Sequence, residues 1–296
     1  MDIRTLRYFR AVARAGSITR AAEELHVSQP ALSRQIIELE RELGQRLFDR
    51  TGRRITLTDR GSLLLNRAQE ILQLFDKTVA EVESPATVGG EVHIGCSETP
   101  TVASLAQAAV RLRHSNPDIV LHLHSEDSDR VTENLEHGLY DFGIMVGPAR
   151  TDLFHALRLP QENRWGVLTC RDSPLAVHSS VDADTLRDTP LILPSKQIAR
   201  ERFYDWMGCA PNEEPRPVAV YNLLYNASLL VREGLGSAVS IDGIVATGSE
   251  TGLAFRPLDP PLTSPVDLVW SRTHRLSPAG EAVLAAMRDI TAQGTR

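Results

Sequence analysis

Apolar and polar positions recur with a helical period through the first sixty residues. Within 3–15, one stripe at spacings of three and four consists of Leu6, Phe9, Val12 and Ala13. A shorter run at 18–25 and a third at 29–44 repeat the pattern, each with a polar side opposite its apolar side. The sequence therefore predicts three short helices in succession, packed around a shared core.

Local signals mark where these helices begin and end. Gly16 is suited to close the first, because glycine adopts the left-handed conformation that often ends a helix. Ser17 and Ser28 are suited to cap the next two, and Pro30 falls in a first turn, where a missing N–H costs nothing. Two helices joined by the turn at 26–28 have the build of a helix-turn-helix, whose second helix can enter the DNA major groove. The alternative is an ordinary helical pair with a solvated face.

A short β-prone stretch, 55–58, follows the third helix, and Leu47 and Phe48 before it are expected in the core. The polar turn between them is centred on Gly52. A hairpin there forms a wing able to place arginines on phosphates or in the minor groove: Arg50, Arg53 and Arg54. The alternative is an exposed basic turn without a partner.

A longer helix is expected over 58–83. Its stripe has spacings of 4, 3, 4, 3 and 4, which is typical of a coiled-coil seam, and consists of Leu64, Ala68, Ile71, Phe75, Thr78 and Val82. A rod of roughly 40 Å with such a stripe is expected to pair with a second chain. The alternative is that the stripe packs on the body of its own chain.

The periodicity changes after the Pro- and Gly-containing hinge at 84–90, where strands and helices alternate. Strands are expected at 91–95, 119–124, 141–146, 165–170, 191–194, 218–221, 237–241 and 266–270, and helices at 101–114, 130–138, 199–207, 224–233 and 278–291. This alternation predicts an α/β body with mostly parallel sheets, covered on both faces. About two hundred residues suggest two lobes, with ligands at the carboxyl ends of the strands.

Charge is divided unevenly along the chain. The net charge is −6, yet residues 1–60 carry 12 Arg and no Lys against 8 acidic residues, a net of +4, and the remainder carries −10. A basic segment joined to an acidic body indicates a polyanionic partner for the first segment only. No apolar run approaches the length of a membrane span, which favours a cytoplasmic protein.

About sixty continuous residues at the start of the sequence resemble the N-terminal domain of LysR-type transcriptional regulators. They include the stretch SITRAAEELHVSQPALSRQII at 17–37. The resemblance implies a winged helix-turn-helix domain at 1–58 and a dimerisation helix with hinge at 59–89. It also implies a two-lobed α/β effector domain at 90–296, similar to type 2 periplasmic binding proteins. Lobe one would hold 90–161 and 267–296, and lobe two 162–266.

Residue roles follow from the same resemblance. Base contacts would come from Gln29, Pro30, Ser33 and Arg34, and backbone or minor-groove contacts from Arg50, Arg53 and Arg54. Dimerisation would use Leu64, Ala68, Ile71, Phe75 and Val82. An effector would contact residues that follow strands of both lobes: Ser97, Thr99, Thr101, Ser128, Val146, Ser195, Gln197 and Ile198. Four acidic residues crowd this region, which leaves a cationic or zwitterionic effector open: Glu98, Glu126, Asp127 and Asp129.

Other chemistries find little support. His122 and His124 share one strand face, but with no third ligand at a defined spacing we predict no metal site. Cys96 lacks a nearby resolving thiol, so a redox role is not favoured. Neither a nucleophile elbow nor a Gly-rich phosphate loop is present, and no cofactor is expected.

The sequence therefore predicts a regulator that binds DNA and a small-molecule effector, and is not an enzyme. It would act as a homodimer or homotetramer on an interrupted palindrome, with RNA polymerase left open as a further partner. The competing class is a solute-binding or transport receptor, because the body resembles solute-binding lobes.

Overall fold

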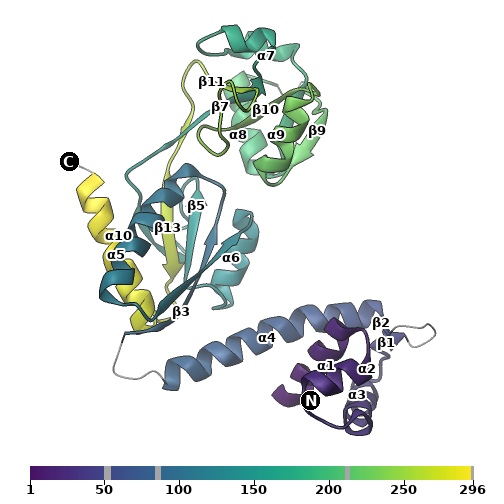
Figure 1. Cartoon of the computed structure of the whole chain (residues 1–296). Helices are drawn as coiled ribbons and strands as arrows, with labels where there is room; N and C mark the ends of the chain where they lie inside the picture. The colour runs from purple at the N-terminus through teal and green to yellow at the C-terminus, as the bar shows by residue number, and fades with distance from the viewer. Residues whose placement is uncertain (50–54, 84–87, 211–213, 295–296) are drawn as a thin grey trace. The chain divides into compact units, whose positions relative to one another are not determined.

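A computed structural model of the chain describes residues 1–49, 55–83, 88–210 and 214–294 (Figure 1). Contacts divide the chain into two compact units, Met1–Ser84 and Pro85–Arg296. Among the described residues, no helix has the length and apolar character needed to cross a membrane.

Three short helices open the first unit: α1 (Ile3–Ala15), α2 (Ile18–Glu24) and α3 (Gln29–Leu43). Gly16 closes α1 in the left-handed conformation, and its N–H donates to the carbonyl of Val12. The Ser17 hydroxyl caps α2 by accepting from the N–H of Arg20. Ser28 precedes α3 as predicted, but its side chain makes no capping hydrogen bond, so α3 begins instead with Pro30 in its first turn.

The turn between α2 and α3 is tight. His26 adopts a φ of 54°, which is unusual for a residue other than glycine. Its backbone reversal lets the N–H of Val27 donate to the carbonyl of Ala22. The small side chains of Ala21 and Ala22 are buried at this point, so the two helices cross closely.

A two-stranded hairpin follows, in which β1 (Phe48–Asp49) pairs antiparallel with β2 (Thr56–Leu57). Leu47 and Phe48 are buried as predicted, and the Phe48 ring packs on that of Phe9 with centroids 5.2 Å apart. We call residues 1–58 the head. Its core continues into the next helix, α4 (Asp59–Glu83), through Ala68 and Leu72.

The second unit contains two sheets. The first, of lobe one, has the order β4-β3-β5-β13-β6: β3 (Gly90–Cys96), β4 (Ile119–Ser125), β5 (Phe142–Val146), β6 (Phe154–Arg158) and β13 (Val266–Ser271). Helices α5 (Ala103–Ser115) and α10 (Pro278–Gly294) cover one face, and α6 (Ser128–Glu136) covers the other (Figure 1).

The sheet of lobe two has the order β11-β7-β10-β8-β9, with β12 also on β7: β7 (Asn163–Cys170), β8 (Leu191–Pro194), β9 (Ala219–Tyr221), β10 (Ser237–Ile241), β11 (Leu253–Pro257) and β12 (Thr263–Ser264). Helices α7 (Ala183–Arg187) and α8 (Gln197–Met207) pack on one face, and α9 (Leu224–Arg232) packs on the other.

Both sheets are mixed, so the expectation of mostly parallel sheets is wrong. In lobe one β3 pairs parallel with β4 and β5, whereas β13 runs antiparallel to β5 and β6. In lobe two β10 and β8 are parallel, whereas β7 runs antiparallel to β10 and β11. The reason is that β7 and β13 begin directly after the chain crosses between the lobes. The pattern of apolar and polar residues also did not predict the short elements β6, β11 and α7.

Gly61 marks a close approach between α4 and the head. A Cβ atom at Gly61 would lie 2.0 Å from the backbone carbonyl oxygen of Leu47. The same carbonyl accepts from the N–H of Thr58, which holds the start of α4 against the hairpin.

We therefore expect Gly61→Ala to destabilise the head by about 1–3 kcal/mol, because the backbone must move to relieve the clash. In an open helix this substitution would instead stabilise. Hydrogen exchange of peptides from 1–49 checks the effect, with the exposed neighbour Ser62→Ala as the control. Unchanged protection of the head in Gly61→Ala would contradict this reading of the contact.

Candidate functional site

The outward face of α3 carries the predicted base-reading residues near its start. Gln29, Pro30 and Arg34 are exposed, and Ser33 is half-buried. On the opposite face Leu32 and Ile36 are fully buried, which holds the helix in place. The head therefore presents the first turns of α3 on a rigid support.

The Arg34 side chain is exposed on this face of α3. Its Nε donates to the carbonyl of Pro30 at 3.3 Å, which lays the guanidinium along the helix surface. Other arginines of this unit are engaged, Arg7 with Asp76 at 2.5 Å and Arg14 with Glu24 at 2.6 Å. Arg34 has no ion pair with any residue that the structure describes. Its charge is therefore available for recognition.

The predicted wing is described only in part. Strands β1 and β2 form the expected antiparallel pair. Arg50, Arg53 and Arg54 lie outside the described residues.

The apolar side chains of α4 form two faces rather than one. The inner face, with Ala68 and Leu72 completely buried and Leu64 half-buried, packs on the head of the same chain. Ala68 is completely buried in its own chain, so its predicted pairing role is wrong, whereas the pairing role of the half-buried Leu64 stays a prediction. The alternative of packing on the same chain holds for this half of the stripe.

The outer face of α4 keeps the other predicted residues. Ile71, Phe75 and Val82 are exposed, Val82 at 81%. The periodicity missed Leu63 and Leu74, which are 53% and 44% exposed on the same side of the helix. The Arg7 guanidinium lies 5.7 Å from the centre of the Phe75 ring and covers part of it.

A cavity of about 540 Å³ lies between the lobes, at the carboxyl ends of their parallel strands, and we call it the interlobe cleft. Six of the predicted effector residues line it: Ser97, Ser128, Val146, Ser195, Gln197 and Ile198. Ser97 and Ser128 lie side by side on lobe one, with their hydroxyl oxygens 3.3 Å apart.

Thr99 and Thr101 are not in the cleft, so their predicted effector role is wrong. Both side chains are buried, and their hydroxyls donate to Oδ1 of Asn163 at 2.8 and 3.2 Å. Asn163 begins β7, directly after the chain has passed from lobe one to lobe two. The two threonines therefore stabilise the crossing, a long-range contact that local sequence does not reveal.

The walls of the cleft differ in charge. Lobe one contributes four acidic side chains, Glu98, Glu126, Asp127 and Asp129, whereas lobe two contributes Lys196 and Arg202 together with Glu201. Arg150 lies in the lobe-one wall but pairs with Asp152 at 2.9 Å. Lys196 belongs to the loop 195–198, which the family resemblance implies as an effector contact, whereas the sequence offered no signal for Arg202.

Lys196 is a partly buried base of the cleft. Burial lowers its pKa, and the carboxylates of Asp129 and Asp127 across the cleft oppose this shift. Glu98 of lobe one also connects the two lobes. Its carboxylate accepts from the N–H of Leu224 at 2.5 Å, at the start of α9 in lobe two. The cleft thus combines a partly desolvated cation with acidic groups on the facing wall.

Cys96 lacks the surroundings of a redox sensor. The side chain is buried, and burial raises the pKa of its thiol to about 12. A thiol that stays protonated near neutral pH is a poor nucleophile. The local sequence, in which no resolving thiol lies near Cys96, likewise does not favour a redox role.

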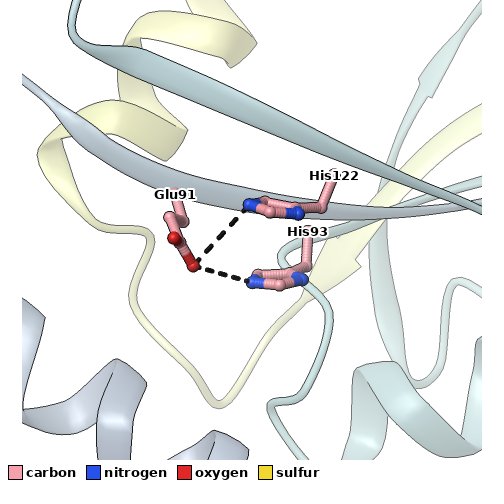
Figure 2. Close-up of side chains that lie close together, drawn as sticks. All are labelled: Glu91, His93 and His122. Carbon is pink, nitrogen blue, oxygen red and sulfur yellow. Dashed lines mark ion pairs between the residues drawn. The ribbon is translucent and has the colours of Figure 1, made fainter.

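The histidine pair of β4 divides between two different partners. His122 faces Glu91 of β3 (Figure 2). Nε2 of His124 instead lies 3.2 Å from Nδ1 of His93. On its other side the His124 ring stacks on Tyr140 with centroids 4.7 Å apart. Glu91 and His93 come from the neighbouring strand, so the spacing within 119–124 does not reveal them as further ligands.

A helix-turn-helix head joined to a two-lobed α/β body defines a DNA-binding transcriptional regulator. Residues 3–62 match the family of "Bacterial regulatory helix-turn-helix protein, lysR family", and residues 85–292 match "LysR substrate binding domain". The chain belongs to the LysR family of transcriptional regulators, whose members are transcription factors and not enzymes.

Relatives and solved structures agree with this assignment. A "Probable RuBisCO transcriptional regulator" of Trichormus variabilis is 37% identical, over 86% of this chain and 77% of that protein. The "Nitrogen assimilation regulatory protein nac" of Escherichia coli is 28% identical, over 98% and 95%. Among solved structures, CbnR, a LysR family transcriptional regulator, shares the fold with a TM-score of 0.73 at 23% identity, covering 98% of this chain and 99% of that chain.

Proposed function

We propose that this regulator reads a specific DNA sequence with the first turns of α3 and responds to a small molecule held in the interlobe cleft. The observation that carries the first half is the outward face of α3, where Gln29 and Arg34 stand on a buried apolar face. Arginine and glutamine are the side chains that pair with guanine and adenine edges in the major groove.

Ser33 and Pro30 complete the proposed base-reading surface. Arg50, Arg53 and Arg54, which lie outside the described residues, are proposed to contact phosphates and the minor groove. Support for DNA as the partner comes from full-length CbnR, which has been solved with its target DNA and shares the fold with a TM-score of 0.71.

We infer that two chains pair through the outer face of α4. Ile71, Leu74 and Phe75 expose neighbouring apolar side chains, with Leu63 two turns earlier, and apolar surface of this kind is costly in water. A second copy has the same stripe, and a twofold interface needs only one self-complementary surface. Two heads then face two half-sites, so the operator is an interrupted palindrome, bound by a homodimer or by a homotetramer of two such pairs.

The effector is proposed to be a small zwitterion. A cleft of about 540 Å³ suits a metabolite rather than a peptide or a duplex. Lys196 and Arg202 of lobe two offer donors to a carboxylate, and the acidic wall of lobe one suits an ammonium group. A ligand that contacts both walls favours the closed arrangement of the lobes and so shifts a conformational equilibrium.

The site of action follows from the target. A chromosomal operator places the proposed activity in the cytoplasm, beside RNA polymerase, which is the proposed further partner at a promoter. Activation requires contact with the polymerase, whereas repression requires only that its site is covered.

Arg34→Ala is expected to weaken operator binding by about 1–3 kcal/mol and to relax the preference at one base pair per half-site, because a bidentate contact is lost. Competition binding with operator variants and random duplex measures both effects. Arg41→Ala, two turns further along the same exposed side of α3, is the matched control and is expected to change the preference little.

Arg53→Ala separates base reading from phosphate contact. We expect it to weaken all duplexes alike and to flatten the dependence of binding on salt. Equal losses on operator and random DNA for Arg34→Ala would remove the proposed base-reading role.

Leu74→Glu is expected to reduce the oligomeric mass by half or more, because it buries a charge in the proposed apolar interface. Sedimentation over a range of concentrations measures the mass. Asn66→Glu adds the same charge to an exposed position away from the stripe and should leave the assembly intact. Loss of assembly in both variants, or in neither, would count against pairing through this face.

Lys196→Met is expected to abolish stabilisation by the effector. In a thermal-shift panel of amino acids and related zwitterions, at least one should raise the melting temperature of the wild type. Removing a charged hydrogen-bond donor should weaken that ligand by about 1.5–3 kcal/mol. Lys77→Met replaces the only other lysine of the sequence and is the control. Stabilisation that persists in Lys196→Met would place the ligand elsewhere.

A further inference from the structure

Three side chains with metal-binding atoms meet on the lobe-one sheet, on the same face as α6. Parallel pairing sets His93 of β3 beside His122 of β4, and Glu91 precedes His93 by two residues on that face. Figure 2 shows the Glu91 carboxylate directed at both imidazoles. Its Oε2 lies 3.7 Å from Nε2 of His93 and 3.6 Å from Nε2 of His122.

We propose that Glu91, His93 and His122 bind a divalent transition-metal ion, with Zn²⁺ as the best match. Two imidazole nitrogens and one carboxylate oxygen are a donor set that such ions accept, with water in the remaining position. A tetrahedral ion with bonds of about 2.1 Å separates its donors by about 3.4 Å. The three donor atoms, all within 4.8 Å of one another, therefore need only a small contraction.

The surroundings of His122 favour an ion. Its Nε2 is buried and has no hydrogen-bond partner among the described residues. The Glu91 carboxylate oxygen lies 3.6 Å from this nitrogen, which is too distant for a hydrogen bond. A buried nitrogen without a partner costs free energy, and coordination would remove that cost.

His93 is already oriented for coordination. Its Nδ1 lies 3.2 Å from Nε2 of His124, and its backbone N–H donates to the carboxylate of Asp141 at 2.8 Å. Metal-bound histidines commonly donate their other ring N–H to a neighbour, which fixes the tautomer. With Nδ1–H donated to His124, the lone pair on Nε2 of His93 points toward Glu91.

Binding requires one movement. The rings of His93 and His122 are stacked, with centroids 4.5 Å apart and an angle of 11° between their planes. An ion between two parallel rings lies outside both ring planes, so the rings must tilt toward each other. The His122 side chain is 38% exposed, which leaves room for this tilt.

The cluster is separate from the interlobe cleft. Glu91 and His93 lie in the first half of β3, whereas the cleft begins after its end, at Ser97. A metal ion and an effector therefore do not compete for ligands. The metal proposal does not rest on the proposed regulatory function, and each can fail alone.

Calorimetric titration of the untagged full-length chain with Zn²⁺, after chelator treatment, tests the proposal. We expect one ion per chain and a loss of affinity of about 100-fold or more in both Glu91→Gln and His122→Gln. His124→Phe should weaken binding by about 10–100-fold as a positioning residue. His114→Gln, an exposed histidine on α5, and Lys196→Met in the cleft should bind like the wild type.

Co²⁺ provides an independent readout. Visible absorption typical of a nitrogen and oxygen site is expected in the wild type and absent from Glu91→Gln, without the sulfur-to-metal bands that a cysteine site would give. Because Glu91 is exposed, its substitution is not expected to unfold the chain. Equal Zn²⁺ affinity in the wild type and the Glu91→Gln/His122→Gln double variant, or no binding by the wild type, overturns the proposal and leaves an ordinary histidine and glutamate ion pair.

Discussion

Burial of the inner face of α4 in the head is the contact on which the first unit depends. Leu72 is fully buried there, and removing a side chain of this size from water stabilises by roughly 1.5–3 kcal/mol. Because Ala68 and Leu72 pack with the core of α1 and α3, α4 cannot rotate without exposing them. Its outer apolar face therefore keeps a constant direction relative to the proposed DNA-reading turns of α3. Pairing through that face would hold two heads at a defined separation.

The second unit is governed by the two places where the chain passes between its lobes. Each passage is followed at once by a strand that runs antiparallel to its neighbour, β7 in lobe two and β13 in lobe one. Thr99 and Thr101 fasten the first passage by donating to Asn163, and Glu98 ties lobe one to the start of α9. These contacts connect the two lobes beside the cleft, so the proposed effector would act on the angle between them.

The lobe-one sheet carries polar chemistry at both ends of its strands. At the carboxyl ends it forms the acidic wall of the cleft, and nearer the beginnings it gathers Glu91, His93 and His122. Between them, the ring of His124 stacks on Tyr140, and the nearby carboxylate of Glu126 adds to the effect of burial in raising the pKa of the Tyr140 hydroxyl. Glu126 itself lines the cleft, so polar groups continue from one region to the other.

Local sequence determined the parts whose signal lies within one helical turn or one strand. The bounds of α1 and β8, the caps at Gly16 and Ser17, and the outward position of Gln29 and Arg34 follow from period, capping chemistry and turn residues. Six cleft residues followed from the rule that ligands gather after parallel strands, combined with the family resemblance.

Only the tertiary structure decided which partner each side chain meets across long separations. In the structure the apolar residues of α4 lie on two faces of the helix, and Thr99 and Thr101 contact Asn163 instead of lining the cleft. The pairing of β3 with β4 places Glu91 beside His122. A helical or strand period states that a side chain faces inward or outward, but not what it faces. Strand register and chain crossings supply that information, because they are fixed by the packing of the whole unit.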